Sequence, residues 1–530
     1  MASQSQQQQE SKTIPLKVLV DKHSNKVVFV EANKDFVETL FSFLSLPLAT
    51  IVRLLATTTN NNNDQKHQQL ESSPFLGNIN KLYQSVKNIT SNDIWISPAC
   101  KQMLLRPRNP CQSLCNKLFL NIDDTESSTE LFVCDSCYTY TTFQNLNCTC
   151  GNPPNKKPRN LDSEGQGNNA QNGVFLRGSG PMFLVSDNLN ILPSSKVNSL
   201  MMLVESGCSD LTKLEEVTHH IGKQQILNLL KYTLTSHEPL TNAIFASSSK
   251  IKYDPPNQSA SAVRVMPSPG DSSKMNIKVV QSKSLKKITT IEDNGDFVDF
   301  IFSILTIPLG SIVRLLGANS FAGCISNLYE SVENLDPTSV LLNPGIALQF
   351  GCPNQILKIP HLQPTPNTYY YGIEPQKAVY DSYYGCYEII RFKLESGGVI
   401  SKTNKSIYNA KILTALNPRS LNSSKKGVVV GFVKRTTFYG VGDNLKVEPL
   451  SANFCLSYLK ELSLPIDDLE VKVITIGEAE ALKFLGALLT SKFTLTSGLK
   501  DFLNVPNRES TTLRVPEQES TTLKVPKQES

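Results

Sequence analysis

The chain is poor in the sequence features that mark catalytic and nucleotide-binding sites. It has one tryptophan and six histidines among 530 residues, and it contains no G-x-S-x-G, no P-loop and no H-E-x-x-H. Those motifs place a nucleophile, a phosphate cradle or a zinc-bound water in a defined local structure. Their absence leaves no recognisable reaction, and an enzyme of unknown class is only the third functional hypothesis.

The chain also lacks a strong imbalance of charge. Its formal net charge is +5, and residues 17–248 carry 20 basic and 20 acidic side chains. Such a balance is a weak indication of nucleic-acid or membrane binding. One segment differs, because residues 396–442 contain no acidic side chain. Its basic residues make it a candidate anion-binding segment, with a flexible insertion loop as the alternative, and the candidate residues are Lys425, Lys426, Lys434 and Arg435.

No apolar run is long enough to cross a membrane. The best candidate, residues 297–317, has fourteen uncharged residues between Asp299 and Arg314, and Pro308 interrupts them. A bilayer span needs about 18, so this stretch predicts a buried helical hairpin that breaks at the proline. The N-terminal MASQSQQQQESK has neither the basic start nor the apolar stretch of a signal peptide. We therefore expect an intracellular protein of the cytoplasm or nucleus that is not secreted.

Two distant parts of the chain repeat one another. Residues 17–55 align without gaps on residues 278–316, with 19 of 39 positions identical. Further along, FLGNINKLYQSVKNI matches FAGCISNLYESVENL, and IGKQQILNLLKYTLTS matches IGEAEALKFLGALLTS. The chain is also longer than one hydrophobic core usually supports. The repeat therefore predicts two homologous tandem domains.

The composition between the repeats sets the expected boundaries. A Pro/Ser/Gly-rich stretch separates the copies, and the C-terminus is a polar ten-residue repeat that is too poor in apolar residues to form a core. We predict a disordered N-terminus at 1–13, a first repeat domain at 14–248 with an Asn/Gln-rich insert at 57–74, a linker at 249–275, a second repeat domain at 276–505, and a disordered tail at 506–530.

Periodicity gives a coarse view of each copy. Alternating apolar residues at 17–31 predict a β-hairpin, and from Asp35 the apolar spacing becomes helical up to Pro47. Asn33 and its counterpart Asn294 are the expected caps of these helices. Later hairpins have Asp-Asn in the turn, and a closing amphipathic helix follows in each copy. Hairpins with segregated packed helices predict an α+β fold.

The most specific chemical motif is a cluster of four cysteines in VCDSCYTYTTFQNLNCTCG. Cys134 and Cys137 form a C-x-x-C, and Cys148 and Cys150 form a C-x-C ten residues later. Two close thiol pairs supply the four soft ligands that Zn²⁺ prefers, so we predict a small zinc-knuckle-like hairpin with a structural zinc ion. Free thiols and a redox or disulfide role are the alternatives. Upstream, PCQSLC adds either a further ligand or two half-buried residues of a helix.

The first hairpin, the proline-broken helix pair, GNINKLYQSV, NPCQSLCNKLFLNIDDTE, the cysteine cluster and SDNLNILP together resemble the plant domain-of-unknown-function 674 family. The resemblance covers nearly all of both copies. It implies a plant source and no particular reaction. The second copy departs from the pattern, because its middle keeps only Cys352 and Cys386.

No convergent polar constellation recurs in both copies, whereas the core-like elements do. The leading hypothesis is therefore a non-enzymatic protein-interaction or scaffold module with an unknown protein partner, in which zinc braces the first copy. The alternative is a nucleic-acid-associated zinc-containing protein that uses the basic segment at 396–442. Strong salt dependence of binding would distinguish the second hypothesis from the first.

Overall fold

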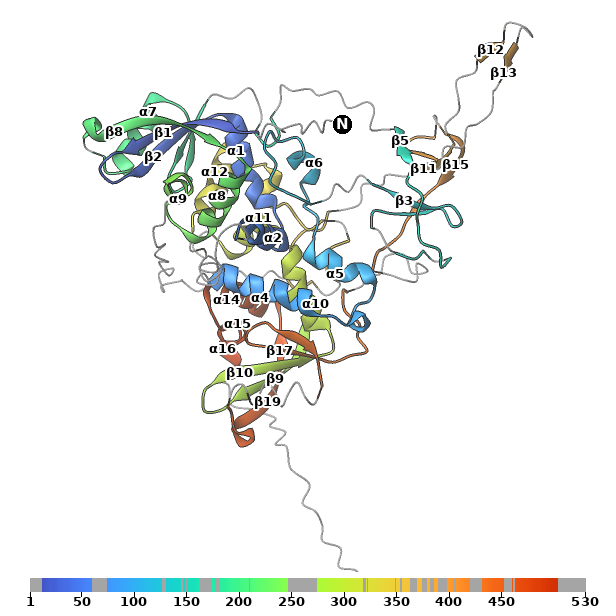
Figure 1. Cartoon of the computed structure of the whole chain (residues 1–530). Coiled ribbons are helices and arrows are strands. Elements are labelled where there is room, and N and C mark those ends of the chain that lie inside the picture. Colours follow the sequence, from blue (N-terminus) through green and yellow to red (C-terminus); the bar gives the residue numbers. More distant parts are fainter. Residues whose placement is uncertain are drawn as a thin grey trace, which may run out of the picture.

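The computed structural model describes residues 12–503 with internal gaps. The longer gaps are 60–73, 126–129, 162–172, 177–181, 246–273, 318–320, 363–368, 374–378, 382–385, 389–397, 420–430 and 452–459, and the others cover one or two residues. Most of the predicted N-terminus, insert and linker, and the whole predicted tail, lie outside the described residues. Figure 1 shows two large sheets at opposite ends of a helical layer, with smaller sheets to one side.

The first large sheet is antiparallel, with the order β7-β6-β2-β1-β8. Its central hairpin forms because apolar residues alternate along β1, where Ile14, Leu16 and Val18 are buried and Lys17 is exposed. Its strands are β1 (Ile14–Asp21), β2 (Lys26–Ala32), β6 (Phe183–Ser186), β7 (Ile191–Pro193) and β8 (Leu214–Ile221).

The second large sheet has the order β18-β17-β10-β9-β19, which is the same arrangement of strands in the later part of the chain. Its long edge strand β19 pairs with β9 antiparallel from Leu469 opposite Ser282 to Ile476 opposite Met275. Its strands are β9 (Met275–Ser282), β10 (Lys287–Asp293), β17 (Tyr439–Gly442), β18 (Val447–Pro449) and β19 (Leu469–Ile476).

Helices from both halves fill the space between the two sheets (Figure 1). The helices of the first half are α1 (Lys34–Phe41), α2 (Leu48–Thr59), α4 (Pro74–Asn88), α5 (Pro98–Leu105), α6 (Gln112–Cys115), α7 (Lys196–Glu205), α8 (Lys223–Thr235) and α9 (Pro239–Phe245), of which α7 lies at the outer edge of the first sheet. In the second half they are α10 (Asp296–Ser303), α11 (Leu309–Leu316), α12 (Ile325–Leu335), α14 (Glu478–Thr490), α15 (Thr494–Gly498) and α16 (Lys500–Leu503).

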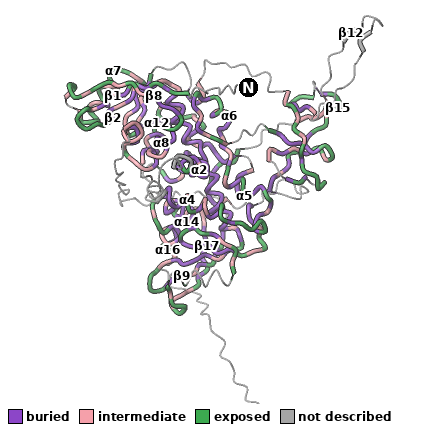
Figure 2. Tube along the Cα trace, viewed as in Figure 1, coloured by how far each residue is buried: buried purple, intermediate pink, exposed green. Residues whose placement is uncertain are grey.

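One continuous hydrophobic cluster runs through this helical layer and includes residues of both halves. Figure 2 shows the buried residues concentrated there, while the outer hairpins are exposed. At its centre the two proline breaks meet, because Pro47 and Pro308 form an antiparallel bridge. Leu48 N–H donates to Ile307 O at 3.2 Å, and Leu309 N–H donates to Leu46 O at 3.0 Å. The two halves therefore share a core.

Short strands form a smaller body beside the helical layer (Figure 1). One sheet has the order β15-β11-β14-β5, and another has the order β16-β4-β3. Each combines strands of both halves. The strands are β3 (Phe132–Cys134), β4 (Thr139–Thr141), β5 (Arg159–Asn160), β11 (Tyr370–Ile373), β14 (Val399–Ser401), β15 (Tyr408–Ile412) and β16 (Thr414–Ala415), and a separate hairpin joins β12 (Val379–Asp381) to β13 (Cys386–Glu388).

The α+β fold is as predicted from the sequence. The apolar stretch at 297–317 forms α10, a 3₁₀ turn and α11, with the break at Pro308. Among the described residues, the helices are all too short or too polar to span a bilayer. Asn33 caps α1 as expected, since its side chain accepts from Phe36 N–H. The matching prediction for Asn294 is wrong, because Asp293 Oδ2 accepts from Gly295 N–H and Phe297 N–H and caps α10 instead.

Candidate metal centre

The four clustered cysteines lie on a hairpin and the loop that follows it. Cys134 ends β3, and Cys137 lies in the turn that leads into β4. Cys148 and Cys150 lie on a second tight turn, where Gly151 N–H donates to Cys148 O at 2.9 Å. Gly151 has φ +84°, a conformation that glycine adopts without strain. The local turns thus bring the two thiol pairs face to face.

The four thiols converge on one point. Their Sγ atoms all lie within 4.8 Å of one another. Cys134 Sγ is 3.3 Å from Cys148 Sγ and 3.5 Å from Cys150 Sγ, and Cys137 Sγ is 3.2 Å and 3.8 Å from the same two atoms. A tetrahedral Zn²⁺ with Zn–S bonds of about 2.3 Å has S–S edges of about 3.8 Å. The donor set and its spacing therefore fit a tetrahedral metal ion, and the predicted cysteines are the ones brought together.

The thiols differ in burial and in acidity. Cys134 and Cys148 are each 4% exposed, whereas Cys150 is exposed. Burial raises the pKa of Cys134 and Cys148. Burial opposes ionisation of Cys137 as well, but hydrogen bonds from Thr139 and the neighbouring thiols lower its pKa to about 6. A hydrogen bond with Cys148 lowers the pKa of Cys150. Cys137 and Cys150 therefore ionise more easily than an ordinary thiol, and the thiolate is the form in which cysteine binds a metal.

The family model described as Protein of unknown function (DUF674) matches residues 10–479. The chain belongs to this family. No curated protein and no solved structure matches the chain.

In this DUF674 protein the cysteine hairpin is bound to strands of the second half. Thr414 N–H donates to Tyr138 O at 2.9 Å, and Leu416 N–H donates to Tyr140 O at 2.7 Å, so β16 extends the hairpin in parallel with β4. Tyr371 Oη donates to Asp135 Oδ1 at 2.7 Å, within the C-x-x-C itself. A small apolar cluster lies beneath these contacts and consists of Leu131, Val133, Ile400 and Leu413.

The upstream cysteines are placed elsewhere. Cys111 and Cys115 are buried in the main hydrophobic cluster, and Cys115 Sγ lies 3.5 Å from Ser45 Oγ. Burial raises the pKa of Cys111 to about 12 and that of Cys115 to about 11. They therefore behave as apolar core residues, the second of the two interpretations that the sequence left open.

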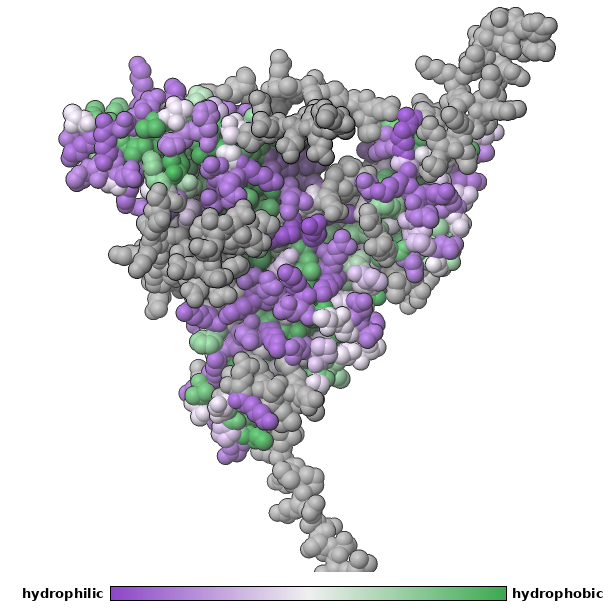
Figure 3. Space-filling view, viewed as in Figure 1, coloured by the Kyte–Doolittle hydropathy of each residue, from purple (hydrophilic) through white to green (hydrophobic). Residues whose placement is uncertain are grey.

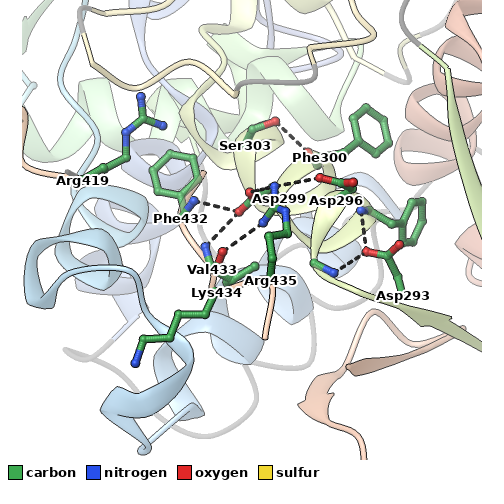
Figure 4. Close-up of polar contacts among 12 residues, drawn as sticks. Asp293, Asp296, Asp299, Phe300, Ser303, Arg419, Phe432, Val433, Lys434 and Arg435 are labelled. Carbon is green, nitrogen blue, oxygen red and sulfur yellow. Dashed lines mark hydrogen bonds and ion pairs between the residues drawn. The ribbon is translucent and has the colours of Figure 1, made fainter. Parts of the chain in front are cut away.

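The predicted anion-binding residues are placed only in part. Lys425 and Lys426 lie outside the described residues. Arg435 pairs with Asp299 at 2.7 Å and with Asp296 at 2.8 Å. Figure 4 shows its guanidinium turned toward these carboxylates, while Lys434 extends away from them. An anion at Arg435 would compete with two carboxylates of the chain, and anion binding by these four residues stays a prediction.

The expectation that no polar constellation recurs in both halves is wrong. Asp299 is fully buried and accepts from Phe432 N–H at 2.8 Å and Val433 N–H at 3.0 Å (Figure 4). Glu38, its aligned counterpart, accepts in the same way from Phe175 N–H at 2.8 Å and Leu176 N–H at 2.9 Å. These carboxylates fasten the segment before the late hairpin onto the first helix. The sequence signal was an acidic residue at the same place in both apolar helices.

A second carboxylate also recurs. Asp187 accepts from Thr241 N–H at 2.8 Å, and its counterpart Asp443 accepts from Leu495 N–H at 2.8 Å and Thr496 N–H at 3.1 Å. Desolvation by burial raises the pKa of Asp187 to about 6 and also raises that of Asp443. Both carboxylates tie the turn of the late hairpin to the last helices. All four recurrent carboxylates bind backbone of their own chain, so they are structural.

Proposed function

We propose that this protein is a non-enzymatic interaction module in which a structural zinc ion braces the cysteine hairpin. The observation that supports the zinc site is the convergence of four thiols with Sγ separations of 3.2–3.8 Å across the two pairs. Four cysteine ligands saturate a tetrahedral ion and leave no open position for a substrate, which is the pattern of structural rather than catalytic zinc.

The zinc ion would hold together a body made from both halves. The hairpin itself has only short strands and a small apolar cluster, too little to be stable alone. Cross-linking its two turns through one ion would fix the edge to which β16 pairs and the carboxylate that Tyr371 contacts. The ion would therefore stabilise the arrangement of second-half strands on a first-half hairpin.

An exposed apolar helix face supports the interaction role. On α7, Val197, Leu200, Met201 and Val204 are 69%, 63%, 47% and 77% exposed, and their spacing puts them on one side of the helix. Figure 3 shows hydrophobic side chains gathered over this end of the molecule. Met202 packs inward. A contiguous exposed apolar face is typical of a protein-binding surface.

The second half provides an internal comparison for this face. The alignment that matches Pro193 with Pro449 places Asn453, Leu456, Ser457 and Lys460 at the four exposed positions. Three of these four are polar, so the sequence of the second half does not keep an apolar residue at these positions; of the four, only Lys460 is among the described residues. The apolar face is specific to the first half, which favours a binding role over a packing role.

Metal analysis of the purified full chain tests the zinc site. We expect about one zinc per chain, and we expect the Cys148→Ser/Cys150→Ser variant to lose the zinc and to melt at a lower temperature. A Cys111→Ser variant is the matched control, because it removes a buried thiol outside the cluster and should keep the metal. A parent protein without zinc would contradict the proposal.

A transplant of the second-half residues tests the interaction face. The Val197→Asn/Met201→Ser/Val204→Lys variant should keep the parent's melting temperature, because these side chains are exposed. Quantitative cross-linking should show proteins that are bound by the parent and lost from the variant. Identical cross-linked sets for the two proteins would contradict a binding role for this face.

A further inference from the structure

Helix α4 makes its polar contacts with the other half of the chain. Ser85 Oγ accepts from Val447 N–H at 2.8 Å, on the edge strand β18 of the second sheet. Asn78 Nδ2 donates to Leu488 O at 2.9 Å, near the end of α14. Leu82 and Val86 on the same helix are buried in the shared core. The helix that follows α2 in sequence thus completes the second half.

Helix α12 makes the reciprocal contacts. Ser331 Oγ accepts from Ile191 N–H at 3.0 Å, on the edge strand β7 of the first sheet. Cys324 N–H donates to Thr233 O at 2.8 Å, near the end of α8. Leu328 and Val332 are buried. This helix, which belongs to the second half by sequence, completes the first.

The two sets of contacts correspond residue by residue. The alignment of LYQSV with LYESV pairs Ser85 with Ser331, and the alignment of the late hairpins pairs Val447 with Ile191. The exchanged backbone bonds at Leu48 and Leu309 are likewise equivalent. The halves are therefore related like the subunits of a dimer that has swapped one helix, joined here by a covalent connection.

The serine hydroxyl explains why this helix is recognised. An edge strand has backbone N–H groups without a neighbouring strand, and a buried N–H without an acceptor is costly. Ser85 is 7% exposed and Ser331 is 1% exposed, so water does not easily replace either hydroxyl. The flanking leucine and valine of each helix are buried in the shared hydrophobic cluster. The serine hydroxyl, which accepts the edge N–H, and the buried leucine and valine beside it are the features of the L-Y-x-S-V pattern that bind the other half.

We propose that each half carries an acceptor surface, made by the end of its closing helix and the edge strand of its late hairpin, which binds an L-Y-x-S-V helix of a second unit of the same kind. In this chain the second unit is the other half. The covalent connection raises the effective concentration of the partner but makes none of the contacts described above. A separate second unit can therefore take its place.

The first test asks whether the halves bind without the covalent connection. A protease site is inserted between residues 255 and 270 of the full chain, and the purified protein is cleaved. We expect the fragments to remain a 1:1 complex with the mass of the whole chain in light scattering. After unfolding in urea with a tagged, cleaved copy and refolding, tagged second halves should capture untagged first halves. Two separate folded monomers, or a failure to reassemble while the uncut chain refolds, would overturn the proposal.

The second test locates the helices by hydrogen–deuterium exchange in the uncut chain. The Ser85→Ala variant should speed exchange of the Val447 amide about fivefold, as expected for the loss of one hydrogen bond, and leave the Ile191 amide unchanged. The Ser331→Ala variant should do the opposite. Ser91→Ala, an exposed position beyond α4, is the control and should change neither. Faster hydrogen–deuterium exchange only in the half that carries the substitution, or no change at either amide, would show that the two halves do not exchange these helices.

Discussion

The guanidinium of Arg435 lies 2.7 Å from Oδ2 of Asp299, a carboxylate with no solvent exposure. Burial raises the pKa of Asp299, while Arg435 and two backbone N–H groups oppose this change by favouring the charged form. The pair therefore holds a charge in the core next to the segment that starts the late hairpin.

Arg435→Met should destabilise the protein by about 3 kcal/mol, because it leaves this carboxylate buried without a counter-charge. We place the value at the low end for a buried pair because the Arg435 side chain is 34% exposed. Urea unfolding measures the change. The double variant with Asp299→Asn should recover much of the loss. Lys446→Met, which breaks the exposed pair with Glu448, should cost no more than about 0.5 kcal/mol. Equal losses in the two single variants would contradict the argument.

Asp187 should make the protein less stable as the pH rises from about 4 to about 6. Its folded pKa is about 6, above the ordinary value of 3.8, so folding favours the protonated form. The stabilisation from that proton is complete below the unfolded pKa and is lost as the pH rises through the folded one. In urea unfolding at pH 7.5, Asp187→Asn should be more stable than the parent by up to about 3 kcal/mol, and the two proteins should have the same stability near pH 4. Parallel pH profiles for both proteins would show that Asp187 does not titrate in this way.

Gly323→Ala should weaken the contact between the halves. A methyl group at this position would lie 2.2 Å from Thr233 O, too close for either backbone to accommodate without moving. We expect a loss of about 1–3 kcal/mol in urea unfolding. Gly486→Ala is the comparison, because a methyl group there meets no atom within 4 Å, and in a helix it should raise stability by up to about 1 kcal/mol. A neutral Gly323→Ala would mean that the contact is looser than the structure shows.

Removal of the metal should loosen the second-half strand β16, which pairs with the cysteine hairpin. If zinc holds the cysteine hairpin, a chelator should speed hydrogen–deuterium exchange of Thr414 and Leu416, whose N–H groups donate to hairpin carbonyls. Peptides from α10, which lie in the shared core, should be unaffected. Unchanged hydrogen–deuterium exchange at residues 414–416 would show that the metal does not stabilise the pairing of β16 with the hairpin.

Much of the fold could be predicted from local patterns in the sequence. Alternation along β1 and the proline at 308 each act within a few residues, so the hairpin and the broken helix pair followed from the sequence. The cysteine cluster was also predictable, because its four residues lie within seventeen positions of one another. The prediction of an Asn294 cap was wrong because Asp293, the residue before it, accepts the hydrogen bond from Phe297 N–H instead.

Contacts between distant segments could not be predicted in this way. Periodicity shows that α4 has an apolar face, but it does not say which half of the chain covers that face. The partner of Arg435 is 136 residues away, and the strand that joins the cysteine hairpin comes from the second half of the chain. A run of basic residues reads as a surface feature until the structure shows where the carboxylates are.

The serine contacts also constrain how the sequence can change over generations. A substitution at Ser85 is felt at Val447, and a substitution at Ser331 is felt at Ile191. A change in either helix therefore affects the stability of the sheet in the opposite half. If one half is deleted from the gene, the remaining half exposes the edge N–H and the apolar surface that the missing helix covered, unless a separate second unit supplies that helix.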